Sequence, residues 1–216
     1  MSTLWTLGDS HTAGHGSTPG FEYCDNYRKE GDRIWPQHLA ERMGMELSNI
    51  GENGCSNDTI IDRVIEYWDS FKEGDTVIIG KTYGHRLDIP NPKPSPKREW
   101  LSIFYHWVQW TQTDPTKKDW REMITEEGFN SLQSYIENWR FNPLYDVRYM
   151  RIFTHYQKIL NDRGVRCIIW DCEIDLVSLP TIRHATKGEI DDGHLSFEGH
   201  KIWADRLYKR INKPLI

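Results

Sequence analysis

Two short apolar runs constrain the fold of this chain more than any other feature of its sequence. "DTVIIG" at 75–80 and "VRCIIWD" at 165–171 are rich in β-branched residues and almost uninterrupted by polar ones. This pattern is typical of parallel strands that are covered by helices on both faces, because neither face of such a strand meets water. We therefore expect a parallel sheet buried between two layers of helices.

Segments with helical spacing separate the predicted strands. "TLWTL" at 3–7 is a third predicted strand, and "ELSNIG" at 46–51 is a weaker fourth. Apolar residues recur at i, i+3 and i+4 in four segments, at 34–45, 60–71, 149–160 and 197–211. Alternation of strands and helices, joined by right-handed crossovers, predicts a three-layer α/β/α sandwich. A chain of 216 residues can bury one core, so we expect a single domain over 1–216.

The segment 89–145 interrupts this alternation and is predicted to be a helical, Trp-rich insertion. Its first part, "IPNPKPSPKREW", is rich in proline and lysine, so we expect an exposed loop there. From Trp100 to Val108 apolar residues recur at helical spacing, which favours a helix packed against the body of the domain. Trp110, Trp120 and Trp139 lack this pattern, and one of them could instead stack on a sugar ring.

Charge and hydropathy exclude several classes of partner. The net charge is −5 and the basic residues are scattered, which argues against binding to nucleic acid or an anionic membrane. No stretch approaches the roughly 20 apolar residues of a membrane-spanning helix. The chain does not begin with a basic segment followed by an apolar run, so we expect a soluble, cytoplasmic protein. Its four cysteines lack CxxC spacing and are expected to be free thiols.

Four polar motifs follow the predicted strands or precede the last helix. They are "GDSHTAG" at 8–14, "NIGENGCSND" at 49–58, "GKTYGHRLD" at 80–88 and "DDGHLSFEGH" at 191–200. Ligands of doubly wound sheets bind beyond the carboxyl ends of the strands. We therefore expect these four loops to converge on one edge of the sheet.

The last motif contains an Asp-x-x-His spacing that suits general base catalysis. In a tight turn, the Asp191 carboxylate can contact one imidazole nitrogen of His194 and leave the other to accept a serine proton. Ser10 would then be the nucleophile, provided that N–H donors face the developing oxyanion. Asp192 is the alternative to Asp191. Because a histidine base must be neutral, activity should rise through the pH range in which histidines lose their proton.

Other histidines near these motifs receive no functional assignment. His200 falls on the core face of its predicted helix. His11 and His15 are interpreted as polar groups of a loop.

Together the motifs resemble those of the SGNH hydrolases, the superfamily of GDSL esterases and lipases. "GDS" at 8–10 resembles the first block, with the nucleophile Ser10, and "DDGH" at 191–194 resembles the last, with Asp191 and His194. "NIGENGCS" at 49–56 resembles the second block, whose last glycine, here Gly54, donates a backbone N–H. The resemblance implies a short parallel, flavodoxin-like sheet and an oxyanion hole formed by the N–H groups of Ser10 and Gly54. It implies no metal and no cofactor.

The third block departs from the family pattern. The family has Gly-x-Asn-Asp after the third strand, where this chain has "GKTYGHRLD", so the asparagine that supplies a third oxyanion donor is missing. The side chains that could replace it, or bind substrate, are those of Thr82, Asn53, Asn57 and Arg86. A threonine followed by an arginine at this place is similar to divergent members that we expect in bacteriophage genomes.

Three functions are compatible with these features. The leading hypothesis is a serine esterase that hydrolyses small acyl esters through an acyl-enzyme, with O-acetyl groups on a carbohydrate among its substrates. The second is a binding module of the same fold with weak or no turnover, because the third-block asparagine is absent. The third is a metal-dependent phosphoesterase, since Asp9-x-His11 after a strand resembles the opening ligands of calcineurin-like enzymes, although their later motifs do not appear.

Overall fold

A four-stranded parallel sheet forms the centre of the computed structural model, which describes residues 2–14, 33–95, 98–103, 126–140, 142–183 and 191–212. The strand order is β2-β1-β3-β6, and every neighbouring pair is parallel. The strands are β1 (Thr3–Leu7), β2 (Glu46–Asn49), β3 (Thr76–Lys81) and β6 (Arg166–Asp171). All four predicted strands are therefore present.

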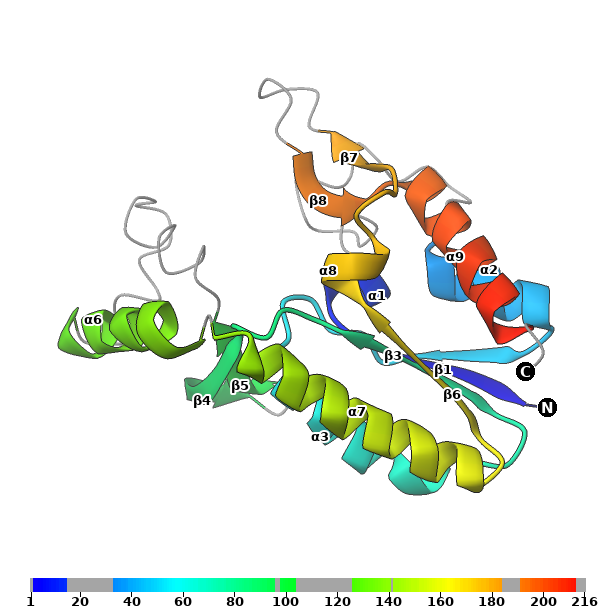
Figure 1. Ribbon diagram of the computed structural model, residues 1–216, viewed down its shortest axis with the longest axis horizontal. Coiled ribbons are helices and arrows are strands. Elements are labelled where there is room, and N and C mark those ends of the chain that lie inside the picture. The colour runs from blue at the N-terminus through cyan, green and yellow to red at the C-terminus, as the bar shows by residue number, and fades with distance from the viewer. Residues whose placement is uncertain are drawn as a thin grey trace.

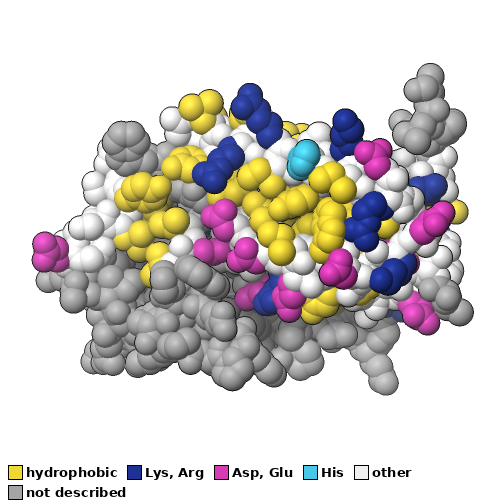
Figure 2. Space-filling view, turned by 90° about the horizontal axis from the view of Figure 1, so that it is seen from below, with side chains coloured by type: hydrophobic (Ala, Val, Ile, Leu, Met, Phe, Trp, Pro, Cys, Tyr) yellow, Lys and Arg dark blue, Asp and Glu magenta, His cyan; other side chains and the backbone are white. Residues whose placement is uncertain are grey.

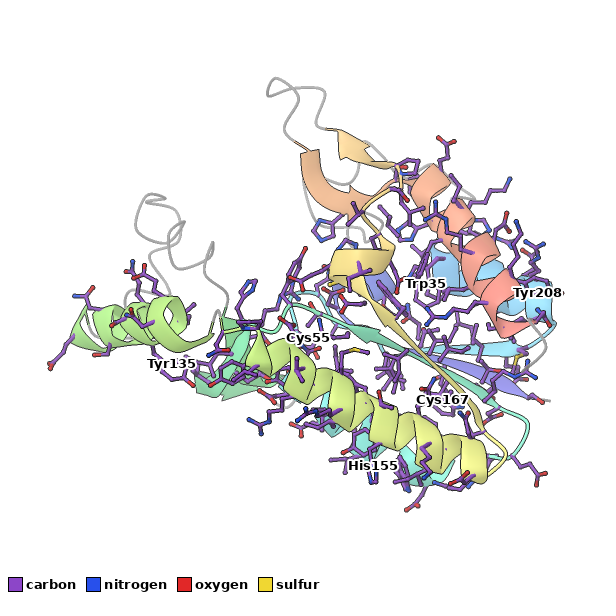
Figure 3. The ribbon with its side chains drawn as sticks, viewed as in Figure 1. Trp35, Cys55, Tyr135, His155, Cys167 and Tyr208 are labelled. Atoms are coloured by element: carbon purple, nitrogen blue, oxygen red, sulfur yellow. The ribbon has the colours of Figure 1, made fainter. Side chains whose placement is uncertain are left out.

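Helices cover both faces of this sheet (Figure 1). On one face lie α2 (Trp35–Met43) and α9 (Phe197–Ile211), and on the other lie α3 (Asn57–Glu66) and α7 (Leu144–Asp162). β1, β3 and β6 therefore contribute residues to two separate cores, one on each face. Figure 3 shows Trp35 and Cys167 on opposite sides of the sheet. The predicted α/β fold with helices in two outer layers is confirmed.

The sharp end of β1 depends on a glycine. A Cβ atom at Gly8 would lie 2.3 Å from Thr12 Oγ1 and 3.3 Å from the Gly80 carbonyl oxygen. Only a residue without a side chain lets the short helix α1 (Ser10–Ala13) turn back this closely. Asp9 caps α1, since its carboxylate accepts a hydrogen bond from the His11 N–H at 3.1 Å. The turn places Ser10 at the carboxyl edge of the sheet.

The segment after β3 differs from the expected loop and helix. β4 (Leu87–Ser95) and β5 (Arg98–Ile103) pair as an antiparallel hairpin, so residues 98–103 are a strand and not the start of a helix. Prolines occur at every second position from 90 to 94, which removes N–H groups from one edge of β4 only. In a two-stranded hairpin, the N–H groups on the outer edge of a strand have no strand to pair with. Prolines whose missing N–H groups lie on that edge are therefore compatible with the hairpin.

A carboxylate ties this hairpin to the sandwich. Asp88 accepts hydrogen bonds from the hydroxyl groups at the start of α3 and in β5, which belong to Ser56, Thr59 and Ser102. The Ser56 hydroxyl also accepts the N–H groups of Asp58 and Thr59, at 3.0 and 3.2 Å, and so caps α3. The contacts of Asp88 with Ser56 and Thr59 span 32 and 29 positions of the chain, beyond the reach of a periodicity argument.

The remaining elements are short or lie away from the sheet. They are η1 (Trp68–Ser70), α6 (Glu126–Tyr135), the π-helical turn Ile136–Arg140, α8 (Cys172–Asp175), β7 (Thr181–Arg183) and β8 (Asp191–Leu195). β7 and β8 form a second antiparallel hairpin. The expected roles of Trp107, Trp110 and Trp120 lie outside the described residues, as do those of the Trp100 and Trp139 side chains.

The surface over α3 and α7 carries apolar side chains among charged ones (Figure 2). Ile65, Leu144 and Val147 are exposed there. Of the helices that the structure describes, none combines the length and apolar character needed to cross a membrane. Cys55, Cys167 and Cys172 are buried free thiols, and Cys24 lies outside the described residues.

Candidate active site

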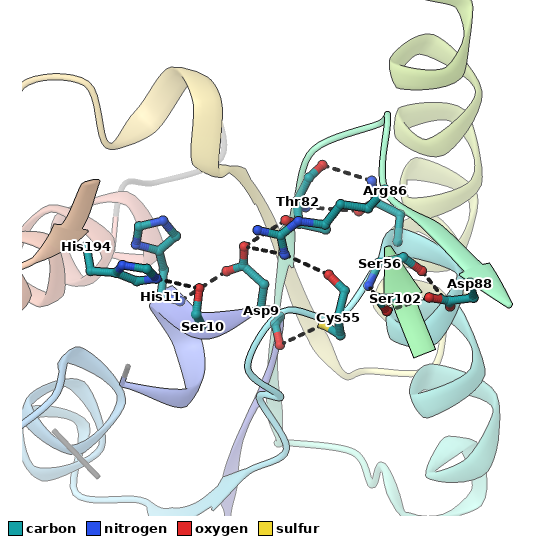
Figure 4. A network of polar contacts seen from close by, with 12 residues as sticks. Asp9, Ser10, His11, Cys55, Ser56, Thr82, Arg86, Asp88, Ser102 and His194 are labelled. Atoms are coloured by element: carbon teal, nitrogen blue, oxygen red, sulfur yellow. Dashed lines mark hydrogen bonds and ion pairs between the residues drawn. The ribbon is translucent and has the colours of Figure 1, made fainter. Parts of the chain in front are cut away.

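Ser10 and His194 meet at the carboxyl edge of the sheet, although 184 positions separate them in the chain. The Nε2 atom of His194 lies 2.8 Å from the Ser10 Oγ (Figure 4). Ser10 is the first residue of α1, and His194 lies near the end of β8, just before the Ser196 cap of α9. The structure thus brings together the nucleophile and the base that the sequence predicts.

The acidic member of the predicted triad is placed only by its backbone. Asp191 begins β8, where it pairs with Arg183 of β7. The side chains of Asp191 and Asp192 lie outside what the structure describes, so the contact of either carboxylate with His194 remains a prediction.

His11 differs from its interpretation as a polar loop residue. It is buried in α1, and the centre of its ring lies 5.0 Å from that of His194. Its carbonyl oxygen accepts a hydrogen bond from the Trp35 Nε1–H at 2.9 Å, which ties α1 to α2. The sequence does not indicate that His11 is buried, because its contact with Trp35 joins residues 24 positions apart in two different helices.

His200 lies on the core face of α9, as predicted, and should make folding sensitive to acid. Burial lowers its pKa from 6.5 to about 3, and the nearby charges of His11, His38 and His194 act in the same direction. The unfolded chain therefore takes up a proton as the pH falls below 6.5, while the folded protein does not. The contribution of His200 to the free energy of unfolding is therefore fully present above pH 6.5. Below that pH it decreases, by about 2 kcal/mol at pH 5.

Replacing His200 with methionine should remove this contribution. The urea stability of His200→Met should fall less between pH 7 and pH 5 than that of the wild type, by about 2 kcal/mol. The exposed His155 on α7 provides the control, because His155→Met should leave the pH dependence unchanged. Parallel curves for wild type and His200→Met would show that the folded protein protonates His200 as easily as the unfolded chain.

Asp9 is the centre of a buried polar network that the sequence did not reveal. Its Oδ2 accepts the Thr82 hydroxyl at 2.7 Å and lies 3.2 Å from Arg86 Nη1, and its Oδ1 accepts the His11 N–H. Burial by itself would raise the pKa of Asp9, but the charges of His11 and Arg86 and these hydrogen bonds together lower it. Asp9 is therefore a carboxylate occupied by protein donors on both oxygens.

This occupancy argues against the phosphoesterase hypothesis. The metal ligand that hypothesis requires first is the Asp9 carboxylate, which here binds Thr82, His11 and Arg86. In the part of the chain that the structure describes, no three His, Cys, Asp or Glu side chains are grouped so that they could hold a metal ion.

The four candidates for a third donor are distinguished by their partners. The Thr82 hydroxyl donates to Asp9, and the Asn57 amide bonds the backbone of Thr82 at 2.8 and 2.9 Å. The Arg86 guanidinium donates to the Cys55 carbonyl at 2.8 Å. The Oδ1 of Asn53 is buried and has no hydrogen-bond partner among the described residues. Asn53 is thus the candidate whose side chain the protein does not already use.

The loop that carries Gly54 runs beside the Ser10 turn. The Glu52 N–H donates to the Gly8 carbonyl at 2.9 Å, and the Cys55 thiol lies 3.5 Å from the same oxygen. A Cβ atom at Gly51 would lie 2.5 Å from the backbone nitrogen of Ala13, so glycine is required for this close approach. Gly54 has a left-handed φ of 75°, with open space where a side chain would be.

A buried lysine cluster lies at the end of β3. Lys81 is 1% exposed, and its Nζ lies 2.9 Å from Asp146 Oδ1 and Asp171 Oδ2, and 3.8 Å from Glu173 Oε2. Burial by itself would lower the pKa of Lys81, but the carboxylates of Asp146 and Asp171 beside it outweigh this effect and raise the pKa. A lysine and an aspartate that end neighbouring apolar strands are the only sequence signal for this cluster.

No protein-family model and no curated protein matches this chain. Among solved structures it is similar to a member of the lipolytic protein G-D-S-L family from Veillonella parvula, at 12% identity and a TM-score of 0.39, over 97% of each chain. It is also similar to an acetyl xylan esterase from Butyrivibrio proteoclasticus, at 10% identity and a TM-score of 0.45, over 97% of this chain and 63% of that one. A catalytic mutant of an acetylxylan esterase from Geobacillus stearothermophilus is similar at 14% identity and a TM-score of 0.41, over 98% of this chain and 94% of that one.

None of these three is a bacteriophage protein, so the expected likeness to bacteriophage enzymes has no support here. At TM-scores below 0.5, the activity of this chain has to be inferred from its own residues.

Proposed function

We propose that this protein is a serine esterase of the SGNH type, with Ser10 as the nucleophile and His194 as the general base. The observation that carries the proposal is the 2.8 Å distance between Ser10 Oγ and His194 Nε2. A base within hydrogen-bond reach can take the hydroxyl proton while the oxygen attacks an ester carbonyl. Asp191 is proposed to orient the imidazole from its place three residues earlier.

Two backbone N–H groups are proposed to stabilise the oxyanion. Among the described residues, no hydrogen bond is found for the N–H of Ser10 or of Gly54, so both are available to a substrate oxygen. The open space at Gly54 would let that oxygen approach the backbone. Donors held in place before reaction stabilise the charge of the tetrahedral intermediate more than that of the ground state.

The proposed reaction has two halves and consumes only the ester and water. Ser10 Oγ bonds to the carbonyl carbon and its proton passes to His194 Nε2. When the intermediate collapses, the bond to the alcohol oxygen breaks and the alcohol leaves with that proton. Water then attacks the acyl-enzyme with His194 again as base, which releases the carboxylic acid and restores Ser10.

Small acyl esters are the proposed substrates, with O-acetyl groups on a carbohydrate among them. Asn53 is proposed as the third oxyanion donor, through its Nδ2–H group, or as a substrate contact, because no hydrogen bond of its side chain is found among the described residues. Thr82, Asn57 and Arg86 are proposed to support the site and not to touch the oxyanion, since each already bonds the protein.

The occupied side chains of Thr82, Asn57 and Arg86 also favour a second candidate, a binding module with weak turnover. If Asn53 does not donate, the oxyanion would have two donors only, and one missing donor costs on the order of 100- to 1000-fold in rate.

A fluorophosphonate probe distinguishes the two candidates. Covalent labelling of Ser10 in the folded protein is expected, because the probe reacts with an activated serine. Ser10→Ala should abolish labelling, and Asn53→Ala should slow it. Ser2→Ala is the matched control, since Ser2 directly precedes β1 and so lies at the opposite end of that strand from Ser10, and its labelling should equal that of the wild type. Absence of labelling in well-folded wild-type protein would support the binding module.

A further inference from the structure

Arg86 joins the two segments that flank the proposed oxyanion donors. One guanidinium nitrogen, Nη1, donates to the Cys55 carbonyl at 2.8 Å and lies 3.2 Å from Asp9 Oδ2. Cys55 directly follows Gly54, and Asp9 directly precedes Ser10. A single nitrogen is therefore bonded to the neighbour of each donor (Figure 4).

The link is buried and held from several directions. The side chains of Arg86 and Asp9 are 9% and 2% exposed, so water screens their attraction little. The guanidinium carbon lies 5.1 Å from the centre of the Tyr83 ring, and the Thr82 hydroxyl bonds the same Asp9 oxygen. Such a network fixes the relative positions of its members more firmly than an exposed ion pair would.

The Gly54 turn needs a link of this kind. Beyond its chain neighbours, no atom lies within 4 Å of the position that a Gly54 Cβ would occupy, so nothing packs against Gly54 itself, although the adjacent Cys55 is buried in the core. Polar contacts add to the hold on this loop, among them those of Glu52 and Cys55 with Gly8 and that of Cys55 with Arg86.

We infer that Arg86 is a positioning residue. By holding the Cys55 carbonyl, it keeps the N–H of the adjacent Gly54 in place beside the N–H of Ser10, so that both can donate to one oxyanion. This inference rests on the proposed function. It gives Arg86 a role through the loop and not through contact with substrate. A planar guanidinium with several donors suits a bond to both an oxygen of a carboxylate and a peptide carbonyl.

The test must separate positioning from a simple need for charge balance. Replacing Arg86 alone leaves the buried Asp9 carboxylate uncompensated, and that variant could fail to fold. The double variant Asp9→Asn/Arg86→Met removes both charges. The matched control is Arg42→Met/Asp205→Asn, which removes an exposed ion pair between α2 and α9.

At a urea midpoint close to that of the wild type, the double variant should lose about 100-fold in kcat and in the rate of fluorophosphonate labelling, with KM nearly unchanged. Hydrogen exchange of the peptide 51–57 should become about tenfold faster, because the loop has lost its tie. Arg86→Lys, which keeps the charge and one donor, should recover most of the activity. The control pair should change none of these values.

Two results would overturn the inference. One is a double variant that turns over and is labelled within twofold of the wild type. The other is unchanged exchange of 51–57 in the double variant, which would show that Arg86 does not hold the loop. If wild-type Ser10 is not labelled at all, the proposed function fails instead, and the exchange measurement still decides whether Arg86 fixes the loop.

Discussion

Replacement of His194 with alanine is expected to lower kcat for a small acetyl ester by about 10⁴- to 10⁶-fold. The reason is that the Ser10 hydroxyl, 2.8 Å from the His194 Nε2, loses the base that takes its proton. Folding should be little affected, because His194 lies at the partly exposed edge of the sheet and not in a core cluster. Steady-state hydrolysis of p-nitrophenyl acetate, with circular dichroism as a check of folding, measures both effects.

His155→Ala is the matched control for this prediction. His155 is exposed on α7, away from Ser10, and its replacement should leave kcat within twofold of the wild type (Figure 3). A loss of less than tenfold in His194→Ala would contradict the proposed role. The imidazole would then lie beside Ser10 without acting as its base.

Replacement of Lys81 with methionine is expected to produce the largest loss of stability. Three carboxylates, those of Asp146, Asp171 and Glu173, lie within 3.8 Å of the Lys81 Nζ and would face one another without it. Removing one partner of a buried ion pair costs about 3–5 kcal/mol. We expect a value of about 3 kcal/mol, because Asp146 and Glu173 are partly exposed and water will hydrate them.

The pH dependence of this loss provides a second measurement. Burial raises the pKa of Glu173, as does the charge of Asp146, whereas Lys81 lowers it. Without Lys81 the carboxylates should take up protons more easily, so the difference between wild type and variant should shrink as the pH falls from 8 to 5. Lys158→Met, at an exposed position on α7, should change stability by no more than about 0.5 kcal/mol in urea unfolding. A comparable value for Lys81→Met would mean that the cluster contributes nothing to folding.

The strands and helices of the sandwich could be predicted because their signals are local. The apolar runs that form β3 and β6 are continuous since both faces are buried, and Gly44 and Gly164, which follow α2 and α7, have left-handed conformations. The hairpin at 87–103 was missed for the opposite reason. The hairpin is held by pairing between β4 and β5 and by the contacts of Asp88 in β4 with the start of α3, and neither leaves a periodic pattern in one strand.

Local sequence was sufficient for the alternating elements and for the candidate pair Ser10 and His194, because a hydrophobic period and a short motif are both complete within a few residues. Only the folded structure shows which side chains are buried and which of them contact one another. The sequence places Lys81 and Asp171 at the ends of predicted strands, but it does not indicate that Lys81 lies among three carboxylates. Nor does it indicate that Arg86 contacts Asp9 and Cys55. Charge pairs of this kind form between segments that the sheet brings together at one edge, so their energies depend on distances that no single segment contains.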